Sequence, residues 1–423
     1  MNHSPLLLQL VIILGTARLL GLILRYMGQS PVIAEMTAGL VLGPIVFGAI
    51  APEWHAQIFQ PASLGALRGL SELGLVLFMF IVGAELRLPT GVRKQLTDAS
   101  WVGILSIIIP MLLGLGVAIL THDSLAPPGV TFWPFALFMA SAMSITAFPV
   151  MARILKERGL TQTALGRLAL TAAAVADVIA WVMLALVVVL ASSDPSWAGF
   201  GATLAGLAAL SALIFLVVRP AIARLLKRFA NDGKPQGSLL AILLIGTFAC
   251  AYATEILNVH AVFGAFLFGA CLPRDDRLLA VLIERIEYVA LIVLMPIFFA
   301  LAGLNTTPDV FAGASLGALG FILAAAIVGK IVGGAAGARL AGQPWRVSLA
   351  IGSLMNARGM MELIVIKVGL DIGVIGNSLF TMLMVMAILT TFMTGPLLTL
   401  FGGKTDRAGG GHLNFLRRSQ GED

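Results

Sequence analysis

Charged residues are scarce in this sequence of 423 residues, because Asp, Glu, Lys and Arg together make up only 11% of it. Hydrophobic residues make up 59%, and the mean hydropathy is +0.99. A soluble domain carries about 25% charged residues, so this chain has too few to cover a water-exposed surface. The composition therefore predicts an all-α polytopic membrane protein that crosses the lipid bilayer many times.

Cysteine and histidine are also rare, with two and five residues respectively. Cys250 and Cys271 lie in apolar segments without a Cys/His cluster beside them, so neither a disulfide framework nor a zinc site is supported. HExxH and P-loop motifs are absent from the sequence. We therefore expect a protein that is not an enzyme and that needs no cofactor.

Gly, Pro and charged residues divide the chain into thirteen apolar segments that are long enough, or nearly so, to cross a hydrocarbon core. They are residues 5–26, 32–49, 69–86, 99–121, 132–155, 164–192, 198–227, 237–256, 260–272, 281–302, 314–341, 347–368 and 376–401. With the N-terminus outside, most Lys and Arg residues fall in cytoplasmic loops, as the positive-inside rule requires. The net charge of +6 is thus a topology signal rather than a sign of nucleic-acid binding, and the C-terminus is predicted to be cytoplasmic.

Asp177 is a lone carboxylate in the apolar run of residues 168–190. A charge at the bilayer centre costs about 2.5 to 3.5 kcal/mol on insertion scales, so it is retained where a partner, an ion or a proton offsets that cost. We predict an ion or proton site here. The alternative is a structural Asp held by neighbouring helices.

Two of the predicted spans are interrupted. Ser144–Pro149 breaks the fifth, because a proline donates no backbone hydrogen bond and disfavours helix at the preceding residue. Residues 355–359, which include Asn356 and Gly359, break the twelfth. The two breaks lie seven spans apart, so a six-span unit repeated after one linker span returns upside down. This pattern predicts inverted six-helix repeats with two crossed discontinuous helices, as in secondary transporters; a simple proline kink is the alternative for the fifth span.

Three further charges lie in the last predicted spans. Arg358 and Glu362 are four residues apart on one helical face, so a purely structural ion pair is as good an interpretation as a functional one. Lys330 lies in a segment whose glycines repeat every four residues, a pattern that favours close helix packing. A buried ammonium group there needs a carboxylate or carbonyl oxygens nearby.

Six sequence blocks follow one another along nearly the whole chain. They are SELGLVLFMFIVGAEL (71–86), SAMSITAFPVMARIL (141–155), AAAVADVIAW (172–181), HAVFGAFLFGACLPR (260–274), MPIFFALAGL (295–304) and MNARGMMELIVIKVGLDIGVI (355–375). Together they resemble the monovalent cation:proton antiporter-2 family, above all its plant and fungal cation/proton exchanger branch and the bacterial relatives of that branch. The resemblance implies a sodium/proton-antiporter fold of thirteen transmembrane helices, a homodimer in the bacterial inner membrane and a role in pH homeostasis.

The resemblance also implies a division of the chain. A panel of dimerisation helices is expected at residues 1–95 (helices 1–3) and 231–304 (helices 8–10), and an ion-translocating core at 96–195 (helices 4–6) and 305–403 (helices 11–13). Residues 196–230 form the linker helix 7. The polar, Gly-rich residues 404–423 are expected to be a disordered cytoplasmic tail.

Several site residues follow from the same resemblance. The transport aspartate of the family matches Asp177, and its unwound crossing segment matches Ser144–Pro149, so Thr146 and Ser144 are candidate oxygen ligands. Its core lysine is similar to Lys330. The acidic residue that opens the third span matches Glu72, to which we assign no role.

One position departs from the family pattern. Electrogenic relatives have an acid directly before the transport aspartate and other members have Asn or Gln, whereas this chain has Ala176. With a single titratable carboxylate, exchange of one cation for one proton is the simplest prediction. Lys330 also loses its usual acidic partner, so its approach to Asp177 or to a backbone carbonyl stays open.

The predicted function is secondary active exchange of K⁺ or Na⁺ for a proton. The two ions compete for Asp177, which movement of the core against the panel exposes alternately to each side. One carboxylate offers too few ligands for a dehydrated cation, so hydroxyls, freed carbonyls and water are expected to complete the shell. The alternatives are a cation channel and a proton-coupled symporter for an organic anion bound by Arg358. The choice between K⁺ and Na⁺ and the direction of flux stay open.

Overall fold

The computed structural model describes residues 5–85, 93–161, 163–191, 197–229, 237–257, 259–273 and 277–402. Every regular element in these residues is a helix. The α-helices are α1 (Leu6–Tyr26), α2 (Pro31–Leu42), α3 (Phe47–Ile50), α4 (Pro52–Ile58), α5 (Leu64–Glu85), α6 (Arg93–Leu125), α7 (Phe132–Ser144), α8 (Phe148–Glu157), α9 (Ala164–Ala191), α10 (Trp197–Leu213), α11 (Arg219–Phe229), α12 (Gly237–Ile256), α13 (Ala261–Cys271), α14 (Arg277–Val289), α15 (Met295–Leu304), α16 (Gly313–Leu340), α17 (Trp345–Met355), α18 (Met360–Asp371) and α19 (Asn377–Gly402). The predicted tail at 404–423 lies outside the described residues.

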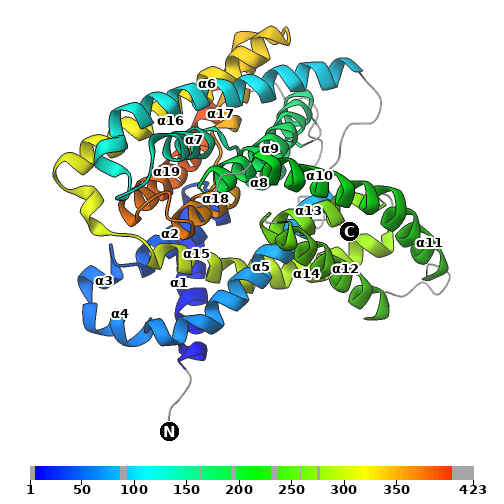
Figure 1. Cartoon of the computed structure of the whole chain (residues 1–423), viewed down its shortest axis with the longest axis horizontal. Coiled ribbons are helices and arrows are strands. Elements are labelled where there is room, and N and C mark those ends of the chain that lie inside the picture. The colour runs from blue at the N-terminus through cyan, green and yellow to red at the C-terminus, as the bar shows by residue number, and fades with distance from the viewer. Residues whose placement is uncertain are drawn as a thin grey trace, which may run out of the picture.

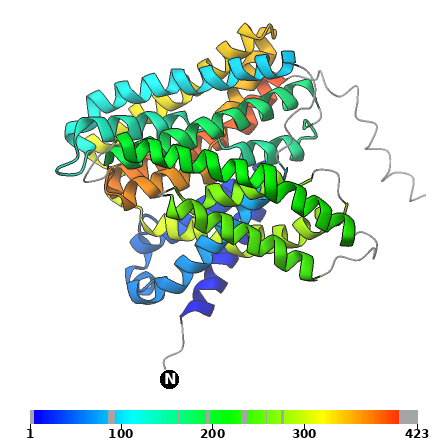
Figure 2. The ribbon, with the colours of Figure 1, turned by 45° about the vertical axis from the view of Figure 1, so that its right-hand side comes forward.

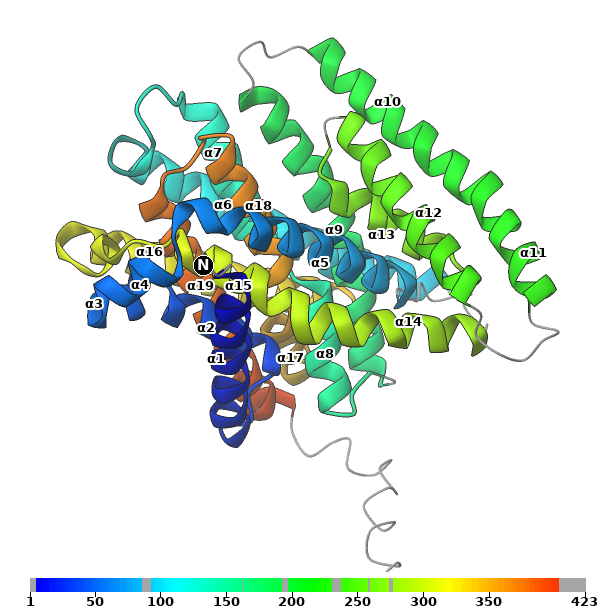
Figure 3. The ribbon, with the colours of Figure 1, turned by 90° about the horizontal axis from the view of Figure 1, so that it is seen from below.

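Two pairs of helices are continuous through π-helical turns. Ile214–Val218 joins α10 to α11, and Ala290–Leu294 joins α14 to α15. Seen from below, α10 and α11 form one long rod at the edge of the molecule (Figure 3).

The protein is an integral membrane protein. Within the described residues, nine helical stretches are long and apolar enough to cross a membrane. The four other predicted spans fall on α7 with α8, on α9, on α13 and on α17 with α18. Two of these four are broken helices, and α13 has only 11 residues. Thirteen crossings therefore remain a prediction.

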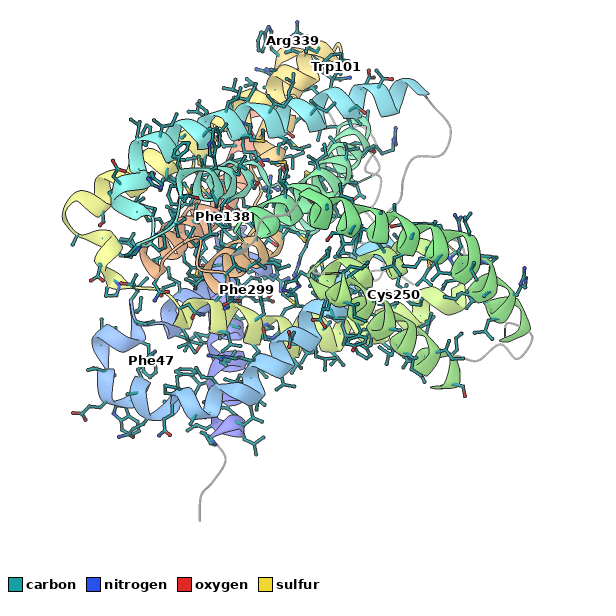
Figure 4. The ribbon with its side chains drawn as sticks, in the orientation of Figure 1. Phe47, Trp101, Phe138, Cys250, Phe299 and Arg339 are labelled. Atoms are coloured by element: carbon teal, nitrogen blue, oxygen red, sulfur yellow. The ribbon has the colours of Figure 1, made fainter. Side chains whose placement is uncertain are left out.

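The helices pack in two groups (Figure 1). In the first group α6 packs against α7, α9 and α16, and α17 packs against α16 and α19. In the second, α5 packs against α13 and α15, and α2 packs against α1 and α15. The helix α6 and the N-terminal end of α1 lie at opposite sides of the molecule in both views (Figures 1 and 2). Phe138 lies inside the first group, and Cys250 lies in the second (Figure 4).

Close backbone contact fixes the position of α16 on α6. A Cβ atom added to Gly333 would lie 2.5 Å from the carbonyl oxygen of Leu105, and one added to Gly337 would lie 2.5 Å from the Cα of Val102. Any larger residue would push the two helices apart, so the packing predicted from the glycine repeat is confirmed. This contact also holds Lys330, one turn earlier on α16, against α6.

Candidate functional site

Both predicted interruptions are present, and they touch each other. The helix α7 ends at Ser144 and α8 begins at Phe148, and residues 145–147 between them are not helical. Residues 356–359, which begin with a turn at Asn356, separate α17 from α18. The backbone N–H of Ala147 donates to the carbonyl of Ala357 at 3.1 Å. The two broken helices therefore cross with direct backbone contact.

Pro149 does not lie in the non-helical segment, which corrects one detail of the sequence prediction. Helix resumes at Phe148, so Pro149 occupies the first turn of α8. A proline is tolerated there because the N–H groups of a first turn have no partner within the helix. The break is therefore shorter than Ser144–Pro149 and covers only residues 145–147.

Gly359 permits the close crossing. A Cβ atom added to it would lie 2.6 Å from Cγ2 of Val150 and 3.9 Å from Cβ of Ala147. Any other side chain at this position would require the side chain of Val150 or the start of α18 to shift. Gly359 is thus placed in the crossing as predicted, and so is Asn356, which caps the end of α17.

Arg358 binds the free end of α7. Its Nη1 donates to the carbonyl of Ala142 at 2.9 Å and to Oε1 of Glu362 at 2.8 Å, and its Nη2 donates to the carbonyl of Met143 at 2.6 Å. Both side chains of the Arg358–Glu362 pair are fully buried. The last carbonyls of a helix lack partners within it and carry partial negative charge, so a guanidinium group stabilises them.

Lys330 binds three oxygen atoms around the crossing. Its Nζ donates to the carbonyl of Ser106 at 3.1 Å, to Oγ1 of Thr146 at 2.6 Å and to the carbonyl of Ser144. Asp177 is an electrostatic neighbour of this ammonium group rather than its hydrogen-bond partner. Of the two possibilities left by the sequence, the structure shows backbone carbonyls as the direct partners.

Asp177 lies on α9, which packs against α6, α7, α8 and α17. Its side chain is 4% exposed. Its Oδ1 has no hydrogen-bond partner among the residues that the structure describes. Buried polar atoms normally have partners, so an unpaired carboxylate oxygen marks a place where a proton or a cation can bind. The preceding residue, Ala176, is also buried and offers no polar atom.

The two candidate hydroxyl ligands, Thr146 and Ser144, differ in the hydrogen bonds that their side chains make. Oγ1 of Thr146 accepts from Lys330 and donates to the carbonyl of Met355 at 3.4 Å. Oγ of Ser144 donates to the carbonyl of Ser141 at 2.9 Å, inside its own helix. Ser144 therefore contributes its carbonyl to the crossing, and Thr146 contributes its hydroxyl.

A pair of threonines on α19 supports the second break, and the sequence analysis missed it. The N–H of Arg358 donates to Oγ1 of Thr391 at 2.8 Å, and this hydroxyl donates back to the carbonyl of Arg358 at 2.7 Å. Nδ2 of Asn356 donates to the carbonyl of Thr390 at 3.1 Å. The signal in the sequence was the pair of adjacent threonines, Thr390 and Thr391, inside a span without charged residues.

The candidate Glu72 and a further pair of charges, Lys367 and Asp371, lie elsewhere. Glu72 is exposed on α5, in the second group of helices. Lys367 pairs with Asp371 on α18, and both side chains are partly exposed. The crossing thus brings together Asp177, Lys330, Arg358 and Glu362, but the structure does not place Glu72 among them.

Known proteins are similar to this chain in sequence and in fold. Residues 11–402 match the family described as sodium/hydrogen exchanger, transmembrane. The Na⁺/H⁺ antiporter NhaS4 of Synechocystis is 38% identical over 402 residues, which cover 94% of this chain and 98% of that protein. The cation/H⁺ antiporter 17 of Arabidopsis thaliana is 38% identical over 93% of this chain, and the K⁺/H⁺ antiporter 1 of Saccharomyces cerevisiae is 35% identical over 94% of it. The chain spans about half the length of these two relatives, 48% and 47% respectively.

A solved structure shows the same architecture. The sodium proton antiporter MjNhaP1 from Methanocaldococcus jannaschii superposes with a TM-score of 0.59 at 16% identity, over 94% of this chain and 100% of that one. At this identity the likeness concerns the fold. With a family match along most of its length and a 38% identical relative that it covers almost end to end, this chain belongs to the sodium/hydrogen exchanger family.

Proposed function

We propose that this chain exchanges a monovalent cation, K⁺ or Na⁺, for a proton, and that both ions use the carboxylate of Asp177. The observation that carries the proposal is the unpartnered Oδ1 of this buried side chain, on a helix packed against both broken helices. The names of the relatives, which are antiporters of Na⁺ or K⁺ with H⁺, support the same function. A channel or a symporter on this fold is not favoured by any of them.

We propose an architecture to match. The first group of helices, α6–α9 with α16–α19, acts as the ion-translocating core, and α1–α5 with α12–α15 act as the panel, with α10–α11 as the linker. Thirteen crossings in inverted repeats place the N-terminus outside and the C-terminus in the cytoplasm. We also propose a homodimer in the bacterial inner membrane. The contact between the two breaks supports this arrangement, because discontinuous helices of inverted repeats meet at the substrate site.

Exchange follows from competition at one carboxylate. Burial favours the neutral, protonated form of a carboxyl group, whereas a bound cation or a nearby ammonium favours the ionised form. Asp177 therefore binds either a proton or an alkali cation, and movement of the core exposes it first to one side and then to the other. The hydroxyl of Thr146, carbonyls of the two breaks and water complete the shell of the cation.

Lys330 is proposed to keep the oxygen atoms of the crossing in position for binding of the cation. Its ammonium group binds oxygens from α6 and from the first break, as an alkali cation would. It also supplies a fixed positive charge close to Asp177 without occupying the carboxylate. The ammonium thereby favours ionised Asp177 when a proton leaves, which lets the cation replace the proton.

The experiment that tests the function uses purified protein in liposomes loaded with a pH-sensitive dye. We expect external K⁺ or Na⁺ to raise the internal pH of acid-loaded liposomes, because each cation that enters removes a proton. Rb⁺ and Li⁺ define the selectivity, and protein-free liposomes provide the background. If none of the four cations changes the internal pH above that background, the proposed function is wrong.

We predict that the exchange is electroneutral. Ionised Asp177 and Glu362 balance the charges of Lys330 and Arg358, and a bound K⁺, Na⁺ or H⁺ adds the same single charge to the crossing. One cation then moves in each direction per cycle. Under a cation gradient on a solid-supported membrane, we expect no current above that of protein-free membranes while the dye assay reports exchange. A current that grows with the exchange rate would show a different stoichiometry.

A further inference from the structure

A fully buried amide group lies within the crossing of the two breaks. Asn356 is 0% exposed and caps the end of α17. The residues on either side of it both contact the first break. The carbonyl of Met355 accepts from Oγ1 of Thr146 at 3.4 Å, and the carbonyl of Ala357 accepts from the N–H of Ala147 at 3.1 Å. Asn356 is therefore held in the crossing by both of its chain neighbours.

The orientation of this amide follows from its contact with α19. Nδ2 of Asn356 donates to the carbonyl of Thr390 at 3.1 Å. A carbonyl oxygen only accepts hydrogen bonds, so the nitrogen of the amide, and not its oxygen, must lie on this side. Oδ1 is buried and has no partner within the described part of the chain. Nε of Arg358 also lacks a partner there, so these two groups do not bind each other.

The donor groups at the first break are already used. An ammonium group has three donors, and that of Lys330 binds the carbonyls of Ser106 and Ser144 and the hydroxyl of Thr146. The hydroxyl of Thr146 donates its single hydrogen to the carbonyl of Met355. An amide oxygen cannot donate, so it cannot turn toward a free carbonyl as a hydroxyl can. It needs a donor or a cation.

Asp177 has an oxygen in the same condition. Its Oδ1 is also buried and unpartnered within the described ranges. The helix α17, which Asn356 caps, packs against α9, which carries Asp177. A cation bound at the crossing would supply the positive charge that both oxygens lack. Carboxylate and amide oxygens are ligands that hard cations prefer.

We propose that Oδ1 of Asn356 is a ligand of the transported alkali cation, beside the carboxylate of Asp177 and the hydroxyl of Thr146. The proposal rests on the proposed cation/proton antiport. An amide is neutral and does not titrate in the physiological range, so it adds affinity for the cation without adding a second proton site. A dehydrated cation needs several oxygens, whereas a proton needs the carboxylate alone. Asn356 thus favours the cation in the competition for Asp177.

Cation binding to the purified protein in detergent tests this role without transport. A ligand that binds only the folded protein raises the unfolding temperature as its concentration increases, and this dependence gives the dissociation constant. The chlorides of K⁺, Na⁺, Li⁺ and Rb⁺ are titrated at alkaline pH, where few protons compete, and choline chloride keeps the ionic strength constant. We expect Asn356→Ala to raise the dissociation constant of the most tightly bound cation about tenfold, as loss of one contact to a charged group predicts.

A purely structural role of the amide would have a different effect. Loss of the hydrogen bond to Thr390 would lower the unfolding temperature in choline chloride but leave the dissociation constant of the cation unchanged, and this result would overturn the proposal. Asn356→Asp keeps an oxygen at this place and should bind the cation at least as tightly as the parent. Should Asn356→Ala fail to give folded protein by size-exclusion chromatography, Asn356→Leu is expected to show the same tenfold loss, and an unchanged dissociation constant would overturn the proposal.

Asn305→Ala is the matched control. Asn305 caps the end of α15 in the second group of helices, and its Nδ2 likewise donates to a backbone carbonyl, that of Leu301, at 2.8 Å. This variant should keep the dissociation constant of the parent. A loss equal to that of Asn356→Ala would show a general effect of removing a capping amide, and the proposal would be wrong.

Binding requires no exchange, so the two proposals fail separately. If the parent binds a cation through Asn356 but the dye-loaded liposomes show no exchange, the antiport function is refuted and the ligand role is kept. If exchange proceeds while Asn356→Ala and its parent have the same dissociation constant, the ligand role alone is refuted. A parent protein whose unfolding temperature responds to none of the four cations would also refute the ligand role.

Discussion

Asp177→Asn is expected to reduce cation/proton exchange to the rate of protein-free liposomes. Asparagine has nearly the same shape as aspartate, but it neither binds a proton in this pH range nor carries the negative charge that balances a cation. Because α9 packs against both broken helices, the rest of the crossing stays in place. The variant thus removes the shared binding group and little else.

The loss should arise without unfolding. Asp177 is buried and one of its oxygens has no partner among the described residues, so removing its charge also removes a desolvation cost. We therefore expect the thermal unfolding midpoint in detergent to equal or exceed that of the parent. The control is Asp123→Asn, since the side chain of Asp123 is fully exposed, and this variant should exchange normally. Exchange by Asp177→Asn at the parent rate would place the ion site elsewhere.

The sequence was sufficient to find the two breaks and the buried carboxylate on the helix that packs against both broken helices. Pro149 and the Asn-Ala-Arg-Gly step interrupt apolar spans, and a charge in an apolar run is costly enough to indicate a site. These features depend on the residue types within a single span, so they can be predicted without knowledge of the fold. The residue at which the first break ends could not be predicted from the sequence, because Pro149 is compatible both with an irregular segment and with the first turn of a helix.

The partners of the buried cations could not be predicted from residue types. Lys330 and Arg358 bind the carbonyls of Ser106, Ala142 and Met143, and every residue carries a carbonyl. Which carbonyls are free depends on where α7 ends and on how closely α16 lies on α6.

Arg358→Met is expected to lower the stability of the protein by about 3 to 5 kcal/mol, the usual cost of removing one partner of a buried ion pair. Glu362 would keep a buried charge without its counterion, and the carbonyls of Ala142 and Met143 would lose their donors. The double variant Arg358→Met with Glu362→Leu removes both charges. It should recover part of the loss, because only the two carbonyls remain unpaired.

Lys367→Met provides the matched comparison, because Lys367 and Asp371 have the same four-residue spacing on the same helix, α18, but are partly exposed. Exposed pairs of this spacing contribute only about 0.3 to 0.5 kcal/mol. Urea unfolding in detergent, followed by tryptophan fluorescence, measures both effects. If burial determines how much an ion pair stabilises this protein, Arg358→Met should lower the midpoint urea concentration several times more than Lys367→Met. Equal shifts would mean that Arg358 does not stabilise the end of α7, and the contact between the two breaks would then depend on backbone packing and Lys330 alone.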